Sequence, residues 1–507
     1  MRKDEGIFKQ LKIILIILFL YFGHHGQFSA ASQEIEKSAL PIWDEVSMNA
    51  YELILEGKTL KAVLYGQSVL EKVDDAMVRD RVGSNLHHNL PFAGRWRKAI
   101  EMLNERGGFA EYSPDFGAEN PELLEPEDAL ATIVRLARGR QIVIINESHH
   151  MSEHRLFSKR LALALREIGF TWLAAEAFHD FSTPIEAMAK RGFPVRTDGT
   201  FLNDPYFADF VRSALAVGYR PVRYEINTQV PPIDTPFHVC DSMANLPTHD
   251  PEGMDPSLAR FLEREKYQAC NIYLRVFKDN PEAKILIHVG HGHVWENVEY
   301  AAEGAPEGSM AAFLKLYTGL DPLTIDQTHG SNNIAAWNWG GRPDGQYVPL
   351  DLALREAFSI ERPTVFRRED GSWLVSPLFS GRVDMTIYHP ALRMVEGRPA
   401  WLAADPDRRP VRLAPFSEPP GHPLVIEAVY PDEGPAAIPV DQVFDRGDSL
   451  DFTLFLPFGE SFTIRLQCPN GDMTDLGSVS VGKSEVRFVR QHDGDDNCEI
   501  PPAQLQP

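Results

Sequence analysis

Histidines that directly follow apolar runs are the residues of this chain best suited to chemistry. One cluster spans Glu147 to His150 and is followed by His154, and a second spans His288 to His293. An imidazole can act as a general base near neutral pH or bind a metal, and a carboxylate can orient its ring. We therefore expect acid–base or metal chemistry where these strands end.

Every expected strand of the middle region ends in ionisable side chains. Apolar runs at 141–145, 170–175, 221–224 and 284–289 predict strands separated by helices, which is typical of a parallel sheet covered on both faces. The ionisable residues at their ends are Glu147, His149 and His150, then Glu176, then Arg223 and Glu225, and last His291 and His293. Because parallel strands end at one edge of a sheet, we expect these side chains to converge.

Spacing within the second cluster suggests which side chains act together. His291 and His293 are two residues apart, so in an extended segment both rings point to one side and His288 points to the other. Gly290 and Gly292 would let a ligand or a neighbouring strand approach the backbone closely. We therefore expect His291 and His293 to act in the site.

Spacing in the first cluster predicts an acid–base pair. Glu147 and His150 are three residues apart, so they share one face if a helix begins there. The alternative for any of these imidazoles is that it only satisfies buried backbone groups at a strand end. We favour that alternative for His288 and His154, and a functional role for His150 and His293.

Several common catalytic templates are absent. The sequence has no Gly-x-Ser-x-Gly elbow, no His-Glu-x-x-His helix, no P-loop and no Gly-x-Gly-x-x-Gly dinucleotide motif. A serine hydrolase of the usual type, a zincin and a nucleotide hydrolase are therefore disfavoured.

The chain divides into regions of different composition. Residues 35–130 predict a helical segment, in which Gly57 to Ala62 is echoed by Gly94 to Ala99, as in a helical repeat, although a plain helical cap fits equally well. Residues 138–330 predict the α/β domain, catalytic or ligand-binding. Residues 362–507 alternate apolar and polar positions between turn residues, which predicts an independent antiparallel β domain resembling a sandwich.

The N-terminus and the charge indicate an exported protein. A basic start, an apolar stretch from Ile13 to Phe22 and small residues to Ala31 predict a signal peptide over 1–31. No later stretch is apolar enough to span a membrane, so none is expected after signal removal. The net charge of −22 disfavours nucleic acid and anionic membrane surfaces as partners. We expect a periplasmic or extracellular protein.

Four cysteines fit an oxidising compartment. Of the possible connectivities, the shortest loops pair Cys240 with Cys270 and Cys468 with Cys498. None has a Cys-x-x-Cys neighbour, so thiolate zinc and thioredoxin-like chemistry receive little support.

The middle region resembles a known superfamily. Asn146 to His150, the predicted helix after them and Gly169 to Glu176 resemble the Gly-Glu-x-x-His, helix, Gly-Phe-x-x-x-x-x-Glu layout of the erythromycin-esterase-like, ChaN-like and Tiki/TraB-like superfamily. A second block, from Arg264 through the strand that ends in the His288 to His293 cluster, resembles its later helix and strand end. Asn146 departs from the usual Gly, and the later block has three histidines where one or two are usual.

The resemblance implies a site but no substrate. By motif position, Glu147 and His150 would be the acid and base, Glu176 the second carboxylate and His293 the later histidine. The superfamily contains macrolide esterases, metal-dependent peptidases and haem-binding uptake proteins.

Three functions remain open. The preferred hypothesis is an exported hydrolase of a small-molecule or peptide substrate, in which His150, oriented by Glu147, activates water against an ester or amide. A divalent metal could assist it, held by Glu147, His150, Glu176, His291 and His293. The alternatives are a haem- or iron-binding uptake protein, with His149 and His288 as candidate ligands, and a scaffold without activity whose flanking domains bind a partner.

Overall fold

The computed structural model describes residues 45–107, 120–178, 184–225, 238–246, 256–300, 306–330, 354–355, 357–376, 379–482, 486–490 and 498. The expected signal peptide, residues 1–31, lies outside these ranges. Within them, no helix combines the length and apolar character needed to cross a bilayer.

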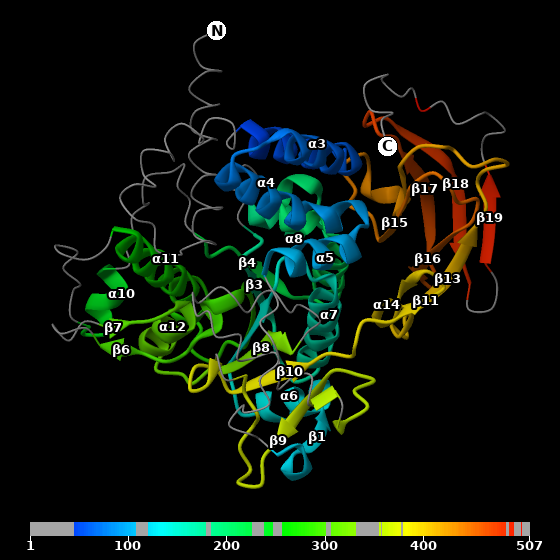
Figure 1. Cartoon of the computed structure of the whole chain (residues 1–507). Helices are drawn as coiled ribbons and strands as arrows, with labels where there is room; N and C mark the ends of the chain where they lie inside the picture. The colour runs from blue at the N-terminus through cyan, green and yellow to red at the C-terminus, as the bar shows by residue number, and fades with distance from the viewer. Residues whose placement is uncertain are drawn as a thin grey trace.

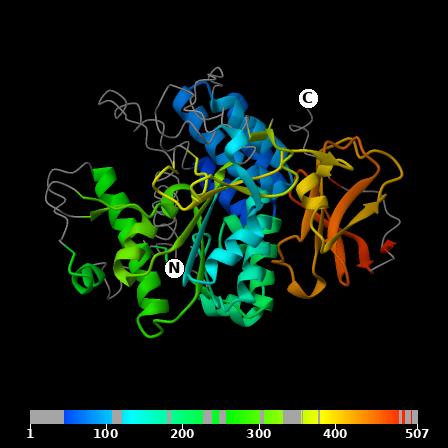
Figure 2. The ribbon, with the colours of Figure 1, turned by 90° about the horizontal axis from the view of Figure 1, so that it is seen from below.

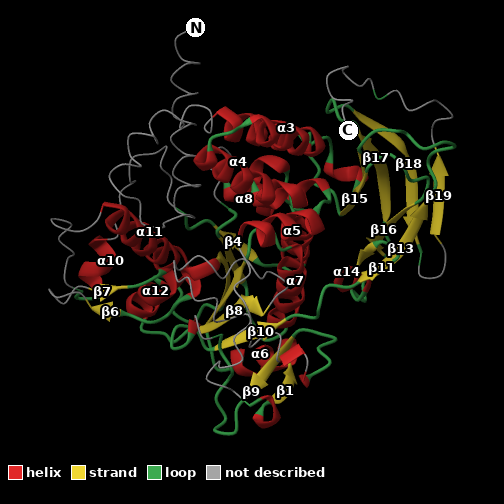
Figure 3. Cartoon of the chain, in the orientation of Figure 1, coloured by secondary structure: helices red, strands yellow, loops and turns green. Residues whose placement is uncertain are grey.

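A sheet of eight strands lies at the centre of the molecule (Figures 1 and 3). Its strands are β1 (Glu125–Asp128), β2 (Ile142–Glu147), β3 (Trp172–Ala175), β4 (Arg220–Val222), β5 (Ile285–Gly290), β8 (Leu323–Gly330), β9 (Thr364–Arg367) and β10 (Met385–Tyr388). They lie in the order β1-β9-β10-β8-β2-β5-β3-β4. Neighbours from β10 to β4 pair in parallel, and β9 and β1 extend one edge antiparallel. The four predicted strands are confirmed as β2, β3, β4 and β5.

Helices cover both faces of this sheet. One face carries α6 (Ala129–Ala137), α7 (Ser152–Arg166) and α9 (Pro205–Ala216), and the other carries α11 (Pro256–Ile272) and α12 (Met310–Thr318). Successive residues of a strand point to opposite faces. Accordingly, Val143 and Ile145 pack in the core with Phe207, whereas Ile142 and Ile144 pack in the core with Phe313. Burial on both sides explains why β2 and β5 are continuously apolar before their polar ends.

The sheet extends beyond the region predicted for it. Residues 382–388 were assigned to the C-terminal β region, but Met385 pairs in parallel with Ile325 of β8, so this assignment is wrong. β1 lies within residues 35–130, which were predicted to be helical, and pairs with β9. An alternating apolar pattern fits a strand in either sheet, and only the long-range pairing decides between them.

The N-terminal region is helical, as predicted. Residues 45–55 are helical and are followed by α3 (Thr59–Lys72), α4 (Ala76–Asn89) and α5 (Trp96–Gly107). Gly57 and Gly94, the first residues of the two echoed segments, each lie two residues before a helix, at φ of 82° and 72°. These positive values suit glycine, which has no Cβ to clash there. The echo therefore marks two similar turn-and-helix starts.

The C-terminal region contains two packed antiparallel sheets. One is β13 (Arg408–Leu413) with β16 (Phe452–Pro457), and the other has the order β15 (Asp441–Asp445), β14 (Leu424–Val429), β17 (Ser461–Gln467), β18 (Met473–Val481) and β19 (Val486–Arg490). Both sheets contribute to one core, for example through Leu454 and Ile464. Figure 2 shows these strands, in orange, on the opposite side of the molecule from the green helices α11 and α12. The predicted fold class is confirmed.

Shorter elements complete the described chain. They are α8 (Ile185–Arg191), α10 (His238–Met243), α14 (Ala400–Ala403), a π-helical turn (Tyr273–Phe277), β6 (Glu299–Tyr300), β7 (Pro306–Glu307), β11 (Met394–Val395), β12 (Arg398–Pro399), and the short 3-10 turns η1 (Leu90–Ala93), η2 (Pro121–Leu123), η3 (Arg196–Asp198), η4 (Phe201–Asn203), η6 (His291–Val294) and η9 (Pro431–Glu433).

Both predicted disulfides are confirmed. Cys240 bonds Cys270, and Cys468 bonds Cys498. The first bridge joins α10 to α11, and the second ties the segment after β19 to the end of β17.

Candidate functional site

The ends of three neighbouring strands bring the predicted residues to one edge. β2 pairs with β5 so that Glu147 lies opposite Gly290, and β3 pairs with β5 so that Ala175 lies opposite His288. Glu147 and Glu176 therefore flank the end of β5 from either side.

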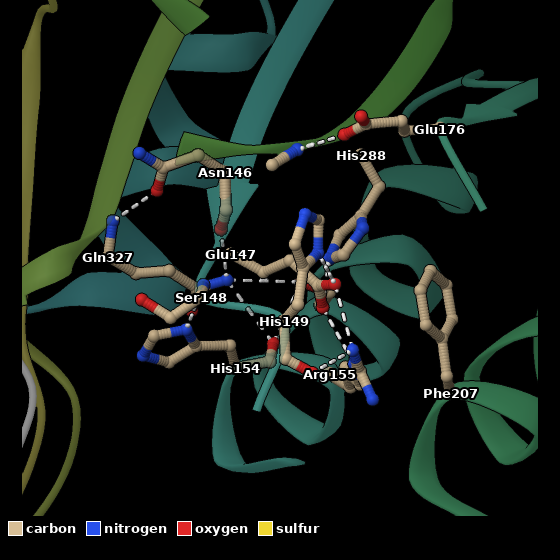
Figure 4. Close-up of polar contacts among 12 residues, drawn as sticks. Asn146, Glu147, Ser148, His149, His154, Arg155, Glu176, Phe207, His288 and Gln327 are labelled. Carbon is tan, nitrogen blue, oxygen red and sulfur yellow. Dashed lines mark hydrogen bonds and ion pairs between the residues drawn. The ribbon is translucent and has the colours of Figure 1, made fainter. Parts of the chain in front are cut away.

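Glu147 is a buried anion that binds two partners. Its Oε2 accepts a hydrogen bond from Arg155 Nε at 2.7 Å, and its Oε1 accepts one from Arg155 Nη2 at 2.9 Å (Figure 4). Oε1 also lies 3.0 Å from His149 Nδ1. Burial opposes the charge, but Arg155 outweighs burial and holds the pKa of Glu147 well below its usual range. The carboxylate therefore orients His149 through Nδ1.

This pairing corrects the expected partner of Glu147. Glu147 is the last residue of β2, and α7 begins only at Ser152, so the helical spacing that would pair Glu147 with His150 does not exist. The intervening residues form a turn, which brings the histidine two positions on back to the carboxylate.

His149 is held from a second direction by an aromatic ring. Phe201 of η4 stacks on it, with ring centroids 4.2 Å apart and planes inclined by 14°. The His149 side chain is 16% exposed, whereas that of Glu147 is 2% exposed. His149 is thus a fixed imidazole that still reaches the surface of the site.

Gly290 lets His149 and Glu176 approach each other. A Cβ on Gly290 would lie 2.7 Å from His149 Nε2 and 2.9 Å from Glu176 Oε2, so these two atoms are at most about 5.6 Å apart. Distances below 3.0 Å to a Cβ are essentially never seen, so no side chain fits at Gly290 without displacing one of them. Close approach at Gly290 was expected for a ligand or a neighbouring strand, and the structure shows it for the side chains of His149 and Glu176.

Glu176 is bound by a backbone amide and a guanidinium. Oε2 accepts a hydrogen bond from Gly290 N at 2.7 Å, and Oε1 accepts one from Arg264 Nη2 at 2.8 Å. Burial opposes its charge, but His293 and Arg264 hold the pKa of Glu176 well below its usual range. Arg264 also bonds Glu225, the predicted ionisable residue after β4.

His291 and His293 do not share one direction. They lie in the 3-10 turn η6 and not in an extended segment, so the side chains diverge. His293 Nδ1 lies 2.8 Å from Glu265 Oε2 on α11. Burial disfavours its charge, but Glu265 and Glu176 outweigh burial and raise the pKa of His293 to about 10. The raised pKa makes His293 easier to protonate than a free imidazole, which disfavours it as a general base or a metal ligand.

His291 faces His149 from a strained backbone. Its φ is 30°, its ring centroid lies 5.5 Å from that of His149, and its carbonyl accepts a hydrogen bond from Asn146 Nδ2 at 3.0 Å. Burial, together with His149 and His150, lowers the pKa of His291 to about 3. His291 is thus a neutral imidazole beside His149.

His288 and His154 are both enclosed, and the expected role of satisfying a buried backbone group is shown for His154. His288 is 1% exposed and its ring packs against Phe207 and Phe210, with centroids 5.0 and 5.5 Å away. Burial lowers the pKa of His288 to about 4. His154 Nδ1 accepts a hydrogen bond from Ser148 N at 3.1 Å, so this ring does satisfy a buried backbone group.

Two further histidines reach the site from the N-terminal helices. α4 places the ring of His88 5.9 Å from that of His149, and the ring of His87 5.3 Å from that of His150, between centroids. Their place in the site was not predicted from the sequence. The local signal is two adjacent histidines in a predicted helix. They lie far along the chain from the other histidine clusters, so the sequence does not indicate that they meet.

Two arginines that bind the carboxylates of the site, Arg155 and Arg264, were also not predicted as site residues. Arg155 lies fully buried on α7, where Asp204 Oδ2 is 3.2 Å from Nη1 and the Phe207 ring centroid is 4.9 Å from the guanidinium carbon. Arg264 was quoted only as part of the family-like block. A charged residue in the buried first half of an otherwise amphipathic helix is the signal that could have identified Arg155.

The expected metal set stays a prediction, and its chemistry does not fit well. Among the described residues, no group of three His, Cys, Asp or Glu side chains is arranged to hold a metal ion. The carboxylates of Glu147 and Glu176 are already bound by Arg155 and Arg264, and the pKa of His293 is raised, which favours its protonated form over a metal-binding one. A haem ligand at His288 would have to displace two phenylalanine rings.

No family model matches the chain, and no curated protein is detectably similar in sequence. Solved structures similar to it include one described as bacterial protein toxins, at 14% identity over 54% of this chain and 57% of that chain, with a TM-score of 0.28. The RRSP effector domain of a MARTX toxin from Vibrio vulnificus CMCP6 is 15% identical over 54% and 55% of the two chains, with a TM-score of 0.28. The type III effector HopBA1 is 16% identical over 41% and 87%, with a TM-score of 0.23.

The chain spans little more than half the length of the first of these structures. TM-scores this low do not establish a shared fold, and no functional conclusion follows from these likenesses.

Proposed function

We propose that the protein is an exported hydrolase in which His149, oriented by Glu147, activates a water molecule against an ester or amide carbonyl. Glu176 is the second group that binds this water. Asn146 to His150 and Gly169 to Glu176 form the strand, helix and strand layout that motivates membership of the erythromycin-esterase-like and ChaN/Tiki-like superfamily, which is part of this proposal.

The observation that carries the proposal is the spacing of two hydrogen-bond acceptors. His149 donates through Nδ1 to Glu147, which leaves Nε2 as an acceptor, and Glu176 is an anion. Nε2 and Glu176 Oε2 are at most about 5.6 Å apart. A water that donates one hydrogen to each at about 2.8 Å, with an angle of about 105° at its oxygen, spans about 4.4 Å, which lies within this upper limit. The water would be held with a lone pair free to attack a carbonyl carbon.

The chemistry needs only groups of this chain. His149 Nε2 takes the proton as the oxygen of the water bonds to the carbonyl carbon, and Glu147 stabilises the imidazolium that results. Arg155 in turn keeps Glu147 ionised. We propose hydrolysis without a metal, because both carboxylates are bound to arginine.

Export is supported by the predicted signal peptide and the two disulfides, because disulfides persist in oxidising compartments. The substrate would be a small molecule or a peptide.

The test is turnover by the protein purified without residues 1–31. Aryl esters, lactones and short peptides are assayed with a chelator, and again with manganese, cobalt or zinc. We expect turnover in chelator that is lost in His149→Ala. Turnover that requires an added metal would contradict the metal-free chemistry. No turnover under any condition, together with stoichiometric haem uptake, would replace the hydrolase with the uptake protein.

A further inference from the structure

A second histidine–carboxylate pair lies at the same edge of the sheet, on β8. β8 pairs in parallel with β2 on the side away from β5, with Ile325 opposite Ile145. The next residue of β8 is Asp326, and His329 follows near the end of the strand. Neither residue belongs to the site described above, and the sequence motifs do not include them.

Asp326 is a buried anion, and both of its carboxylate oxygens have hydrogen-bond partners. Its Oδ1 accepts hydrogen bonds from Asn146 Nδ2 at 2.9 Å, Thr328 N at 2.9 Å and Thr328 Oγ1 at 2.7 Å. Its Oδ2 accepts one from Thr386 Oγ1 at 3.2 Å and lies 3.1 Å from His329 Nδ1. Burial opposes the charge, but His329 and these hydrogen bonds lower the pKa of Asp326 to about 2.

His329 is held in the same manner as His149. In each case a carboxylate contacts Nδ1, at 3.1 Å for His329 and 3.0 Å for His149. In each case a phenylalanine fixes the ring: Phe379 lies edge-on to His329 with centroids 4.3 Å apart, and Phe201 stacks on His149 at 4.2 Å. A carboxylate and an aromatic ring together fix both the tautomer and the plane of an imidazole.

The two pairs are joined through Asn146 and His291. Asn146 Nδ2 donates to Asp326 Oδ1 at 2.9 Å and to the His291 carbonyl at 3.0 Å, and η6 packs against β8. The His291 ring contacts that of His149. Positive charge on His149 and on His329 disfavours protonation of His291. His291 therefore links the two pairs: its ring faces that of His149, and its carbonyl shares the Asn146 donor with Asp326.

We propose that Asp326 and His329 form a second acid–base pair of the same site, in which His329 protonates the leaving group while His149 deprotonates the water. This inference rests on the proposed hydrolase function. The water oxygen bonds to the carbonyl carbon and His149 Nε2 takes its proton. The bond from carbon to the leaving oxygen or nitrogen then breaks, its electron pair goes to that atom, and His329 in its imidazolium form supplies the proton. Both rings return to their starting protonation by exchange with solvent.

A leaving-group comparison tests the assignment. A nitrophenyl ester leaves as a stable anion and needs no acid, whereas an alkyl ester or an anilide of the same acyl group needs a proton. His329→Asn is the informative variant, because its amide nitrogen can take the place of Nδ1 beside Asp326 while Nε2 is deleted. We expect kcat/KM to fall by about two orders of magnitude or more on the alkyl ester or anilide, and by less than about threefold on the nitrophenyl ester.

Thr386→Val is the matched structural control, because it removes one hydrogen bond to Asp326 and leaves His329 in place. Its effect on kcat/KM should be equal for the two leaving groups, and thermal melts check that both variants fold.

The outcomes separate the two proposals. An active wild type whose His329→Asn variant loses equal activity on both leaving groups, or none, overturns the second pair and leaves the hydrolase intact. A wild type that turns over none of the aryl esters, alkyl esters, lactones, anilides and short peptides overturns the hydrolase and the second pair with it.

Discussion

Charged side chains are buried in two regions of this protein, and they are arranged differently. At the sheet edge, Glu147 and Glu176 each bind an arginine and also face a histidine, and His149 and His293 keep exposures of 16% and 12%. Between α9 and the C-terminal β region, the charged groups bind one another and are closed to solvent. Partly exposed imidazoles beside ionised carboxylates therefore distinguish the site from a structural ion network.

The structural network is dense. Asp209 on α9 accepts hydrogen bonds from Lys159 at 2.9 Å and Arg408 at 2.6 Å, and Tyr206 donates to Asp441 at 2.7 Å. Asp441 is fully buried, and Asp209, Tyr206 and Arg408 are at most 4% exposed. The β region was predicted to be independent. A buried charged interface of this kind argues that it depends on the α/β region, because unpaired buried charges are costly.

The largest expected effect is on catalysis and distinguishes two adjacent histidines. His149→Asn removes Nε2 but keeps an N–H that can reach Glu147, so turnover should fall by about two to four orders of magnitude with the fold retained. His150→Asn should reduce turnover far less, because the Glu147 carboxylate orients His149. Steady-state kinetics on whichever substrate is found, with thermal melts of both variants, measure this. Equal losses in the two variants would return His150 to the catalytic role first expected.

The next effect is on stability and concerns two arginines of one strand. Arg408→Met leaves Asp209 and Asp405 less compensated in the interior, so the free energy of unfolding should drop by about 3–5 kcal/mol. Arg412→Met is the control, because its pair with Glu396 is exposed and should contribute nothing measurable. Denaturant unfolding of both variants measures the difference, and similar stabilities would mean that the network contributes little.

A methyl group at Gly290 tests the close approach. Its φ of −81° and ψ of 147° suit any residue, so Gly290→Ala acts only through the collision of the new Cβ with His149 and Glu176. A displacement of about 1 Å can reduce turnover by about 100-fold, and we expect a loss of that size. Gly292→Ala in the same turn meets only the Trp295 ring and should have the smaller effect. The reverse order of kcat/KM losses would contradict the proposed geometry.

The last expected effect is a dependence of stability on pH. Glu265 and Glu176 raise the pKa of His293 to about 10, from about 6.5 in the unfolded chain. The folded state thus holds a proton that the unfolded state has released, so this stabilisation is complete below about pH 6.5 and declines at about 1.4 kcal/mol per pH unit up to pH 10. Denaturant unfolding between pH 6.5 and 10 should show a shallower decline in His293→Gln. Equal declines of the unfolding free energy in the wild type and in His293→Gln would show that His293 does not bind this proton.

The sequence predicted the strands that are buried on both faces and the glycine that permits close approach. β2 and β5 have an unbroken apolar pattern, and their polar ends follow directly. The prediction that His150 pairs with Glu147 was wrong, because a short turn before α7 was taken as helix. The contribution of β10 could not be recognised, since the sequence around Met385–Tyr388 alternates apolar and polar residues as in a half-buried strand, although all four residues are buried in the structure.

Contacts that form only through tertiary packing also could not be predicted from the sequence. His87, His88 and Phe201 come from elements far from Glu147 in the chain, and nothing in their local pattern specifies contact with it. Arg155 is a partial exception, because a charge within a buried part of a helix needs a partner, and the nearby Glu147 is one of the carboxylates that could supply it.

At position 291, the stability of the fold and the proposed activity favour different residues, because the backbone of His291 is left-handed. A residue other than glycine at a φ of 30° costs about 1–3 kcal/mol, which the hydrogen bond from Asn146 helps to offset. Glycine would relax this backbone, and it would also delete the ring beside His149. Selection for thermal robustness alone would therefore favour glycine here, whereas the histidine of this chain keeps an imidazole ring beside His149 at the cost of that strain.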